Sequence, residues 1–213
     1  MIVKSYMTAN PITVDEGTSI NEALFLMKKK RIRSLPVMKH EKLVGIVTDR
    51  DLQKVTPSTA TTLDIWELNY LLAKLTVRDA MTPNPVTISP NESIAKAALL
   101  MHERTFESLP VMDEGKLIGI ITESDVFAAL VTLTGVKDGG IEIEVEMPDT
   151  PSSCKAVGDT IRERGLMMRG SLCHFDGARE GYRRVAFRVV GQELKPFVEW
   201  IRSKYTVVSV SED

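Results

Sequence analysis

The 213-residue sequence lacks any long hydrophobic run and contains only two cysteines, Cys154 and Cys173. No apolar stretch approaches the ~20 residues that a membrane-spanning helix needs, so we expect a chain that does not cross a bilayer. The first residues, Met-Ile-Val-Lys-Ser-Tyr, lack the apolar core of a signal peptide, and two cysteines are too few for a disulfide framework. These absences predict a cytoplasmic protein.

The sequence also lacks an excess of either charge. Its 27 Lys and Arg residues against 29 Asp and Glu residues give a net charge of −2. A chain with this balance has no overall attraction for nucleic acid or anionic lipid, so we expect neither nucleic acid nor membrane as a partner. The local run of basic residues at 28–31 is expected to stabilise a helix end, and Arg183 and Arg184 are expected to be solvated on a hairpin.

What the sequence does contain is an internal repeat. The segment Gly45–Asp51 reads Gly-Ile-Val-Thr-Asp-Arg-Asp, and Gly119–Asp125 reads Gly-Ile-Ile-Thr-Glu-Ser-Asp, 74 residues later. The same offset relates Leu-Pro-Val-Met at 35–38 to Leu-Pro-Val-Met at 109–112. A constant offset without a gap indicates two copies of one folded unit.

The residue pattern of each copy predicts the element order β-α-β-β-α. A short strand begins near Pro11 in copy one and near Pro85 in copy two, because proline excludes helix and the β-branched residues that follow favour a strand. The helix that follows has apolar residues at helical spacing, which places its methionine in the core. These residues are Ile20, Ala23, Leu24 and Met27 in copy one, and Ile94, Ala97, Ala98 and Met101 in copy two. Two strands joined by a polar turn and a second helix, opening near Thr48, complete the unit.

Residues 63–76 between the copies predict a linker helix that is started by a Thr62 cap. Its apolar residues nearly encircle it, with Trp66 and Tyr70 as anchors one turn apart. A helix that apolar must be covered on more than one side, by the neighbouring repeat and by another subunit. We therefore expect a homodimer or a higher oligomer.

After Gly135 the pattern predicts the order β-α-β-β-α-β. Ile141, Ile143 and Val145 alternate with glutamates, as in a half-exposed strand. A helix, a hairpin of strands at 172–175 and 182–190 around Asp176-Gly177, a second helix and a last strand follow. This order describes a ferredoxin-like sandwich with two helices on one face of an antiparallel sheet. The fold class is therefore α+β, with repeats at 1–62 and 77–134, the linker helix at 63–76, and a C-terminal domain at 135–213.

The turn after the strand at 43–47 carries the polar residues that we single out. Thr48 and Asp51 have the spacing of a capping box, in which the side chains satisfy free backbone N–H groups at a helix start. In a second interpretation, Asp51 accepts hydrogen bonds from the hydroxyls of a ribose, and Thr48 meets ribose or phosphate at the positive helix end. Gly45 then lets the backbone approach the ligand. We expect that a carboxylate bound to a sugar does not also close its own helix.

Three motifs occur in both copies: a Met-Thr-x-x-Pro-x-Thr opening, a Leu-Pro-Val strand and a Gly-x-x-Thr-x-x-Asp turn. Together they resemble a tandem pair of cystathionine-β-synthase (CBS) domains, over about Val3 to Ala129. The resemblance implies that the copies pack with pseudo-twofold symmetry and leave two clefts for adenosine-containing ligands. The implied regulatory ligands are AMP, ADP, ATP or S-adenosylmethionine, and no cofactor is required.

The resemblance also implies ligand-binding residues, by motif position. Asp51 and Thr48 belong to one cleft, and Asp125 and Thr122 belong to the other, with each carboxylate on the ribose. The base is implied to lie against one of two matched sets, which are Ile12, Thr13, Leu35 and Pro36, or Val86, Thr87, Leu109 and Pro110.

The two copies differ in charge where a phosphate is expected. Copy one has Arg33 and Arg50, whereas the matching positions of copy two carry Glu107 and Ser124. Because a guanidinium suits phosphate and a carboxylate repels it, we predict that phosphorylated nucleotides prefer the cleft of Asp51. The competing interpretation is that both arginines pair with local acids on the surface.

The C-terminal element order resembles an ACT domain, a small-molecule regulatory fold that pairs across subunits. The turn before its first helix reads Asp149-Thr-Pro-Ser, without the glycine that often frames an amino-acid ligand in that family. A CBS pair, a linker helix and an ACT-like domain in one chain resemble the acetoin-utilisation accessory proteins of bacteria. That resemblance implies a regulatory protein and not an enzyme.

The remaining candidates for chemistry are cysteine and histidine. Cys173 and His174 could begin a metal site, but adjacent strand residues point to opposite faces and cannot close around one ion. His40 is expected in a turn and His102 on the exposed face of a helix, both solvated. No recognisable nucleophile context accompanies them, so we expect no metal site and no catalytic residue.

The sequence leaves three candidate functions for this protein. The first is a sensor, whose ligand shifts the population of one arrangement of the repeats and so changes affinity for an unidentified protein partner. The second is a structural adaptor with empty clefts that uses both domain types for oligomerisation. The third, an enzyme, lacks a nucleophile, a base and metal-ligand spacing. The sensor is the function that we predict.

Overall fold

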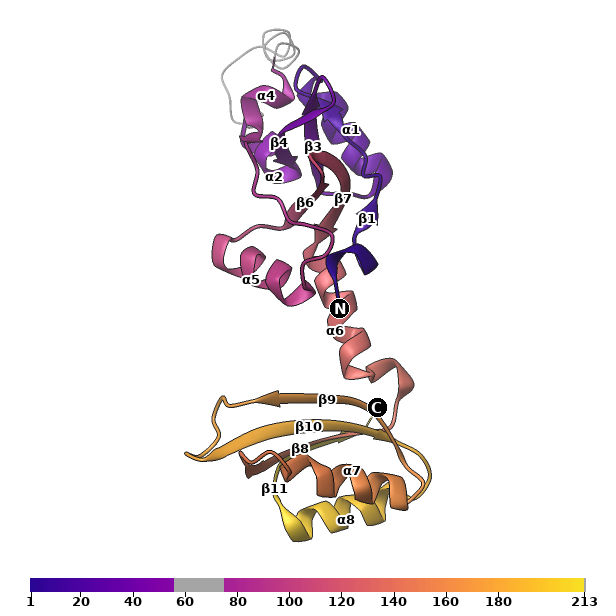
Figure 1. Cartoon of the computed structure of the whole chain (residues 1–213). Helices are drawn as coiled ribbons and strands as arrows, with labels where there is room; N and C mark the ends of the chain where they lie inside the picture. The colour runs from indigo at the N-terminus through magenta and orange to yellow at the C-terminus, as the bar shows by residue number, and fades with distance from the viewer. Residues whose placement is uncertain (56–74, 213) are drawn as a thin grey trace, which may run out of the picture. The chain divides into compact units, whose positions relative to one another are not determined.

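The structure is a computed structural model of the chain that describes residues 1–55 and 75–212 (Figure 1). The chain forms two compact units, Met1–Val126 and Phe127–Asp213. The body of the predicted linker helix, with Thr62, Trp66 and Tyr70, lies outside the described residues. No helix among the described residues is both long and apolar enough to span a membrane.

The N-terminal unit contains both repeats in the predicted order. Copy one comprises a 3-10 turn η1 (Val3–Ser5), β1 (Thr8–Ala9), β2 (Val14–Asp15), α1 (Ile20–Lys30), β3 (Ser34–Lys39), β4 (Lys42–Thr48) and α2 (Asp49–Val55). Copy two comprises α4 (Val77–Ala80), β5 (Thr82–Pro83), α5 (Ile94–Arg104), β6 (Ser108–Asp113) and β7 (Lys116–Thr122), followed by α6 (Glu123–Thr134). The strand expected after Pro85 is reduced to one parallel bridge between Ile88 and Val111.

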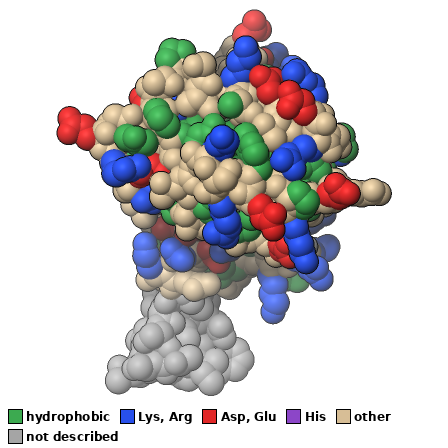
Figure 2. Space-filling model, turned by 90° about the horizontal axis from the view of Figure 1, so that it is seen from below, with side chains coloured by type: hydrophobic (Ala, Val, Ile, Leu, Met, Phe, Trp, Pro, Cys, Tyr) green, Lys and Arg blue, Asp and Glu red, His purple; other side chains and the backbone are tan. Residues whose placement is uncertain are grey.

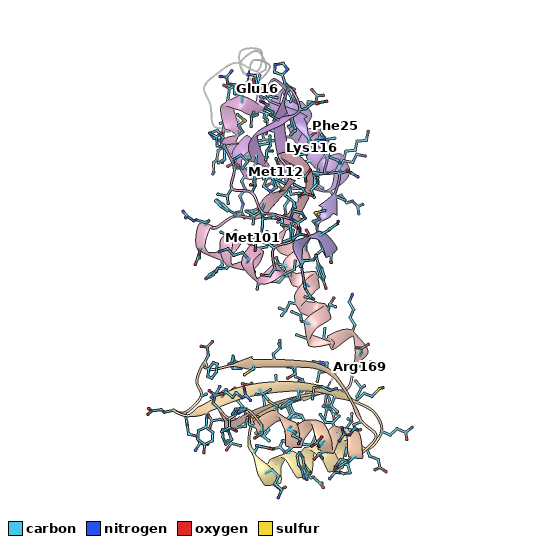
Figure 3. All side chains as sticks on the ribbon, viewed as in Figure 1. Glu16, Phe25, Met101, Met112, Lys116 and Arg169 are labelled. Atoms are coloured by element: carbon cyan, nitrogen blue, oxygen red, sulfur yellow. The ribbon has the colours of Figure 1, made fainter. Side chains whose placement is uncertain are left out.

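The first helix of each copy buries the apolar stripe that its spacing predicts. In α1 the buried residues are Ile20, Ala23 and Met27, and in α5 the matching residues are buried. Ser19 Oγ accepts a hydrogen bond from Glu22 N at 3.2 Å, which caps the start of α1. Phe25 lies on the outer side of α1 and is 66% exposed (Figure 3). The methionine of each stripe is therefore a core residue, as expected.

The opening segments of the two copies are exchanged between their sheets. β1 of copy one pairs antiparallel with β7 of copy two (Figure 1), and β5 of copy two pairs antiparallel with β4 of copy one. The sheet orders are β1-β7-β6 and β2-β3-β4-β5. At the matched positions Ser34 and Ser108, the two hydroxyls contact each other at 2.9 Å, as equivalent residues do on a twofold axis.

The C-terminal unit is one antiparallel sheet with two helices on one face (Figure 1). After a 3-10 turn η2 (Val136–Asp138), its elements are β8 (Ile141–Pro148), α7 (Ser153–Glu163), β9 (Met167–His174), β10 (Tyr182–Val190), α8 (Leu194–Lys204) and β11 (Thr206–Glu212). The strand order is β11-β8-β10-β9, and the predicted element order is confirmed. Helices and sheet share a core that includes Phe187, Phe197 and Ile143.

The edge strand β9 is longer than expected. The hairpin is predicted from Leu172, but β9 begins at Met167. Met167 and Met168 are 52% and 40% exposed, so this part of the strand lacks the alternation of buried and exposed residues that reveals a strand in a sequence. Arg169, labelled in Figure 3, pairs with Asp138 at 3.7 Å.

Candidate functional site

Two cavities of similar size lie between the copies in the N-terminal unit. The first cleft, of about 320 Å³, is lined by Asn10, Ile12, Arg33 and Pro36 from copy one and by Thr122 and Asp125 from the end of copy two. The second cleft, of about 310 Å³, is lined by Thr48, Arg50 and Asp51 from copy one and by Asn84, Val86 and Pro110 from copy two. Each cleft therefore combines the opening segment of one copy with the Thr-x-x-Asp turn of the other.

Ten of the fourteen predicted ligand-binding residues line one of these clefts. The other four, Thr13, Leu35, Thr87 and Leu109, line neither. Leu35 is fully buried and Leu109 is 1% exposed, so their expected contact with a base is wrong. Along β3 and β6 successive side chains alternate between the core and the cleft, and it is the prolines at 36 and 110 that line the clefts.

Both Thr-x-x-Asp turns form capping boxes. Asp51 Oδ2 accepts hydrogen bonds from Thr48 N at 3.1 Å and from Thr48 Oγ1 at 2.7 Å. Asp125 Oδ2 accepts from Thr122 N and from Thr122 Oγ1, each at 2.8 Å. The first interpretation of these residues, as capping boxes that close a helix start, is therefore correct for both copies.

The cap does not use the whole carboxylate. Asp125 Oδ1 has no hydrogen-bond or ion-pair partner in the part of the chain that the structure describes, and Asp51 Oδ1 contacts only Lys54 Nζ, at 3.4 Å. The cap therefore uses one oxygen of each carboxylate and leaves the other outside its hydrogen bonds. The expectation that a carboxylate bound to a sugar does not also close its own helix stays a prediction. A carboxylate held by its own turn is also pre-oriented, which reduces the entropy lost on binding.

A third box of the same kind lies outside both clefts. Asp79 Oδ2 accepts from Thr76 N at 2.8 Å and from Thr76 Oγ1 at 2.9 Å, at the start of α4. These hydrogen bonds hold the pKa of Asp79 below its usual value of 3.8. The Thr-x-x-Asp pattern alone therefore predicts a cap, and only its place beside a cavity distinguishes the other two.

The two arginines expected in one cleft lie in different clefts. Arg33 lines the first cleft, with Asp125, and Arg50 lines the second, with Asp51. The prediction that both guanidiniums face Asp51 is wrong, because the cleft that Arg33 lines is closed by Thr122 and Asp125 of copy two. Arg50 Nη1 pairs with Glu107 Oε1 of copy two at 2.8 Å, rather than with an acid of its own copy.

The glycines at 45 and 119 make room for protein rather than for ligand. A Cβ on Gly45 would lie 2.5 Å from Met81 Sδ and 3.2 Å from the carbonyl oxygen of Thr82. A Cβ on Gly119 would meet Met7 and Thr8 at the same distances. The close approach therefore comes from the exchanged strands β5 and β1, which corrects the expectation of backbone contact with a ligand.

Several lining residues were not predicted. Asn10 and Asn84 occupy matching places, each with positive φ (49° and 48°), and Ile32 of the first cleft is matched by Phe106 of the second. The repeated Asn-Pro dipeptide, at the same offset of 74 residues, was a signal that could have found the asparagines. Arg31 had no such signal, because its matched position, Thr105, differs in chemistry.

The basic pair of the C-terminal unit is bound within that unit. Arg183 donates to Ser153 Oγ at 2.6 Å, and Arg184 donates to the carbonyl of Gly177 at 2.5 Å and lies 3.9 Å from Glu144. The expectation that both are solvated is wrong, because their side chains are only 20% and 27% exposed. On the face that Figure 2 shows, Lys and Arg side chains are interspersed with Asp and Glu.

Cys173 and His174, the candidates for a metal site, are adjacent residues of β9. His174 pairs with Arg184 across the sheet and its Nε2 is 3.3 Å from Glu144, whereas Cys173 stands opposite buried Val185. The two side chains therefore leave opposite faces of β9. Within residues 1–55 and 75–212, no group of three or more His, Cys, Asp or Glu could hold a metal ion. His40 and His102 are exposed.

Comparison with known sequences identifies the family of the N-terminal unit. The family model described as CBS domain matches residues 3–57 and 77–132, about half of the chain. Inosine-5'-monophosphate dehydrogenase of Korarchaeum cryptofilum is 36% identical over 125 residues, which are 58% of this chain and 23% of the dehydrogenase. The match thus spans about a quarter of that enzyme's length.

Three solved structures are similar over about three fifths of the chain. CBSX2 of Arabidopsis thaliana in complex with AMP is 37% identical, with a TM-score of 0.50 over 61% of this chain and 96% of that chain. The CBS pair of protein MJ0100, in complex with 5'-methylthioadenosine and S-adenosyl-L-methionine, is 29% identical, with a TM-score of 0.50 over 61% and 99%. A protein described as the acetoin utilization protein AcuB of Vibrio cholerae is 27% identical, with a TM-score of 0.54 over 65% and 96%.

Proposed function

Because this chain belongs to the CBS domain family, we propose that it is a regulatory protein whose N-terminal unit binds adenosine-containing ligands in its two clefts. The observation that carries the proposal is a carboxylate in each cleft that is fixed by its own turn through one oxygen, while its other oxygen contacts no described group in Asp125 and only the exposed Lys54 in Asp51. A ribose presents two neighbouring hydroxyl donors, which an ionised carboxylate oxygen accepts. AMP, 5'-methylthioadenosine and S-adenosylmethionine, which occupy similar CBS pairs, all contain this ribose.

The walls of each cleft suit the rest of an adenosine. In the first cleft, Ile12 and Pro36 offer apolar contact for a base, and Thr122 and Asp125 lie on the facing copy for the ribose. In the second cleft, Val86 and Pro110 take the place of these apolar residues, with Thr48 and Asp51 opposite. A few polar groups in an apolar cavity of this size are typical of a small-molecule site.

The proposed regulatory mechanism couples ligand binding to the arrangement of the two repeats. Each cleft is closed by segments of both copies, so a ligand that prefers one spacing of the copies stabilises that spacing. Any protein partner that also prefers it then binds more tightly in the presence of the ligand. This role requires no catalytic residue, and the dehydrogenase relative matches only over a part of its length that contains this chain's repeats.

For the C-terminal unit we propose an ACT-like role in assembly or in sensing a second small molecule. Its β-α-β-β-α-β order and its strand order β11-β8-β10-β9 support a ferredoxin-like fold, to which ACT domains belong. The accompanying proposal is a homodimer in the cytoplasm that acts on an unidentified protein partner. Analytical ultracentrifugation of the full chain at micromolar concentration is expected to show a dimer or a higher oligomer, and a monomer would contradict this part.

Thermal unfolding of the full chain with AMP, ADP, ATP and S-adenosylmethionine tests the sensor. A ligand that binds only the folded state at 100 times its Kd adds about 2.7 kcal/mol of stability, which raises the melting temperature by several degrees. Inosine monophosphate without the exocyclic amine and ribose 5-phosphate without the base serve as matched control ligands. No shift with any of the four adenosine compounds would contradict the sensor and favour the adaptor with empty clefts.

A further inference from the structure

The two clefts have the same frame but different charges at matched positions. Residues 31 and 33 are arginines in the first cleft, and the corresponding positions of the second cleft are Thr105 and Glu107. The third difference is at the opposite wall, where the second cleft has Arg50 and the first has Ser124. Both clefts thus contain cationic side chains, and what separates them is whether those cations are already paired.

In the second cleft each cation has a carboxylate partner. Arg50 Nη1 lies 2.8 Å from Glu107 Oε1, and Lys54 Nζ lies 3.4 Å from Asp51 Oδ1. Glu107 is the less exposed member of its pair, with a side chain that is 25% exposed against 73% for Arg50. A phosphate in this cleft would have to displace Glu107 from Arg50 and would then lie near a carboxylate without its partner.

In the first cleft the guanidiniums are available. Neither Arg31 nor Arg33 forms an ion pair in residues 1–55 and 75–212, and both line the cavity. Glu107 also borders this cleft, but its charge is engaged by Arg50. The groups that oppose an anion here are Asp125, which the ribose would engage, and the exposed Glu123. Guanidinium forks bind phosphate through two parallel hydrogen bonds, so two of them outweigh one exposed carboxylate.

We infer that the first cleft is the site for an adenosine ligand with a phosphate, and that the second cleft selects an adenosine ligand without negative charge. This assignment rests on the proposed function, since it divides the same ligand class between the two sites. Arg31 and Arg33 are the phosphate-recognising residues of the first cleft. Glu107 is the residue that sets the specificity of the second, because it occupies Arg50, the guanidinium that lines this cleft among the described residues, and a phosphate would have to displace it.

Isothermal titration of the full chain with AMP and with adenosine tests the assignment. AMP is expected to bind one site per chain, and Asp125→Asn is expected to abolish this binding whereas Asp51→Asn leaves it in place. Arg33→Gln should weaken AMP about tenfold or more and change adenosine binding less than about twofold, because only the phosphate contact is lost. Glu107→Gln should raise the number of AMP sites from one to two.

Two exposed residues of α5 outside both clefts provide matched controls for the change in charge. Arg104→Gln and Glu103→Gln are expected to leave AMP affinity and stoichiometry unchanged. Loss of AMP binding in Asp51→Asn but not in Asp125→Asn would overturn the assignment, as would an equal loss of AMP and adenosine affinity in Arg33→Gln. If neither AMP nor adenosine binds the wild-type chain, the proposed function itself fails, which is a distinct result. Circular dichroism of each variant establishes that it is folded.

Discussion

Replacing Gly45 by alanine tests the exchange of strands between the two copies. The added Cβ would lie 2.5 Å from Met81 Sδ, 3.1 Å from Met81 Cγ and 3.2 Å from the carbonyl oxygen of Thr82. Met81 packs against the core of this unit, so displacing its thioether costs contacts, and the carbonyl belongs to β5, whose residues pair with Gly45 and Ile46 in β4. The clash with the carbonyl is therefore relieved only by moving the exchanged strand, whereas the clash with Met81 depends on its side chain.

The expected cost follows from this geometry. Inserting one methyl group into a packed site that cannot give way destabilises a protein by about 1–3 kcal/mol. Gly119→Ala should cost the same, because Met7 and Thr8 stand at the same distances from it in the other sheet. Gly158→Ala in α7 is the matched control, since a Cβ there meets no atom within 4 Å and alanine favours a helix by up to about 1 kcal/mol.

Urea unfolding of the full chain, followed by circular dichroism, measures these free energies. The double variant Gly45→Ala, Met81→Ala separates packing against Met81 from other causes. Its loss of unfolding free energy should be smaller than the sum of the losses in Gly45→Ala and Met81→Ala alone, by at least about 0.5 kcal/mol. The reasoning is refuted if Gly45→Ala is as stable as the wild type, or if the two substitutions are additive.

Three further predictions concern single sites. Thr76→Ala should cost about 1 kcal/mol of stability by removing a helix cap, and AMP affinity should not change because this box lines no cleft; a weaker affinity in titration would contradict that. Phe187→Ala should cost about 3–5 kcal/mol and leave AMP binding intact, whereas Phe175→Ala, at an exposed site, should change stability by less than about 0.5 kcal/mol in the same unfolding assay. The hydrogen bond from Arg179 holds the pKa of Glu146 below its usual value of 4.5, so this pair stabilises the fold above about pH 4.5, and the gain is lost as the pH falls through the lowered pKa. Between about pH 6 and about pH 3, the free energy of unfolding of Glu146→Gln should therefore fall less than that of the wild type. Equal losses would rule the linkage out.

The local residue pattern predicted those helices and turns whose formation depends on residues close together in the sequence. The stripe of Ile20, Ala23 and Met27 identified α1 and its buried face, and the Thr-x-x-Asp turns identified two helix starts. These features follow from helical periodicity and capping, which act over a few residues. The element order of both units was predictable for the same reason.

Features that depend on packing between the copies were not predictable in this way. The repeat offset shows which residues are equivalent, but it does not show that Arg33 faces Asp125 of the other copy rather than Asp51 of its own. The pairing of β1 with β7 likewise joins segments more than 100 residues apart, and nothing in either short strand specifies its partner. Leu35 and Pro36 are adjacent and similar in polarity, and only the register of β3 decides which of them is in the core.

The most direct test of the account is isothermal titration of the double variant Asp51→Asn, Asp125→Asn with AMP and with S-adenosylmethionine. The substitutions retain the shape of both turns and remove the two carboxylates that the clefts present. Binding of both ligands is expected to be lost, while Asp79→Asn, in the box outside the clefts, binds them as the wild type does. Undiminished binding by the double variant would contradict the central claim that the two clefts are adenosine sites.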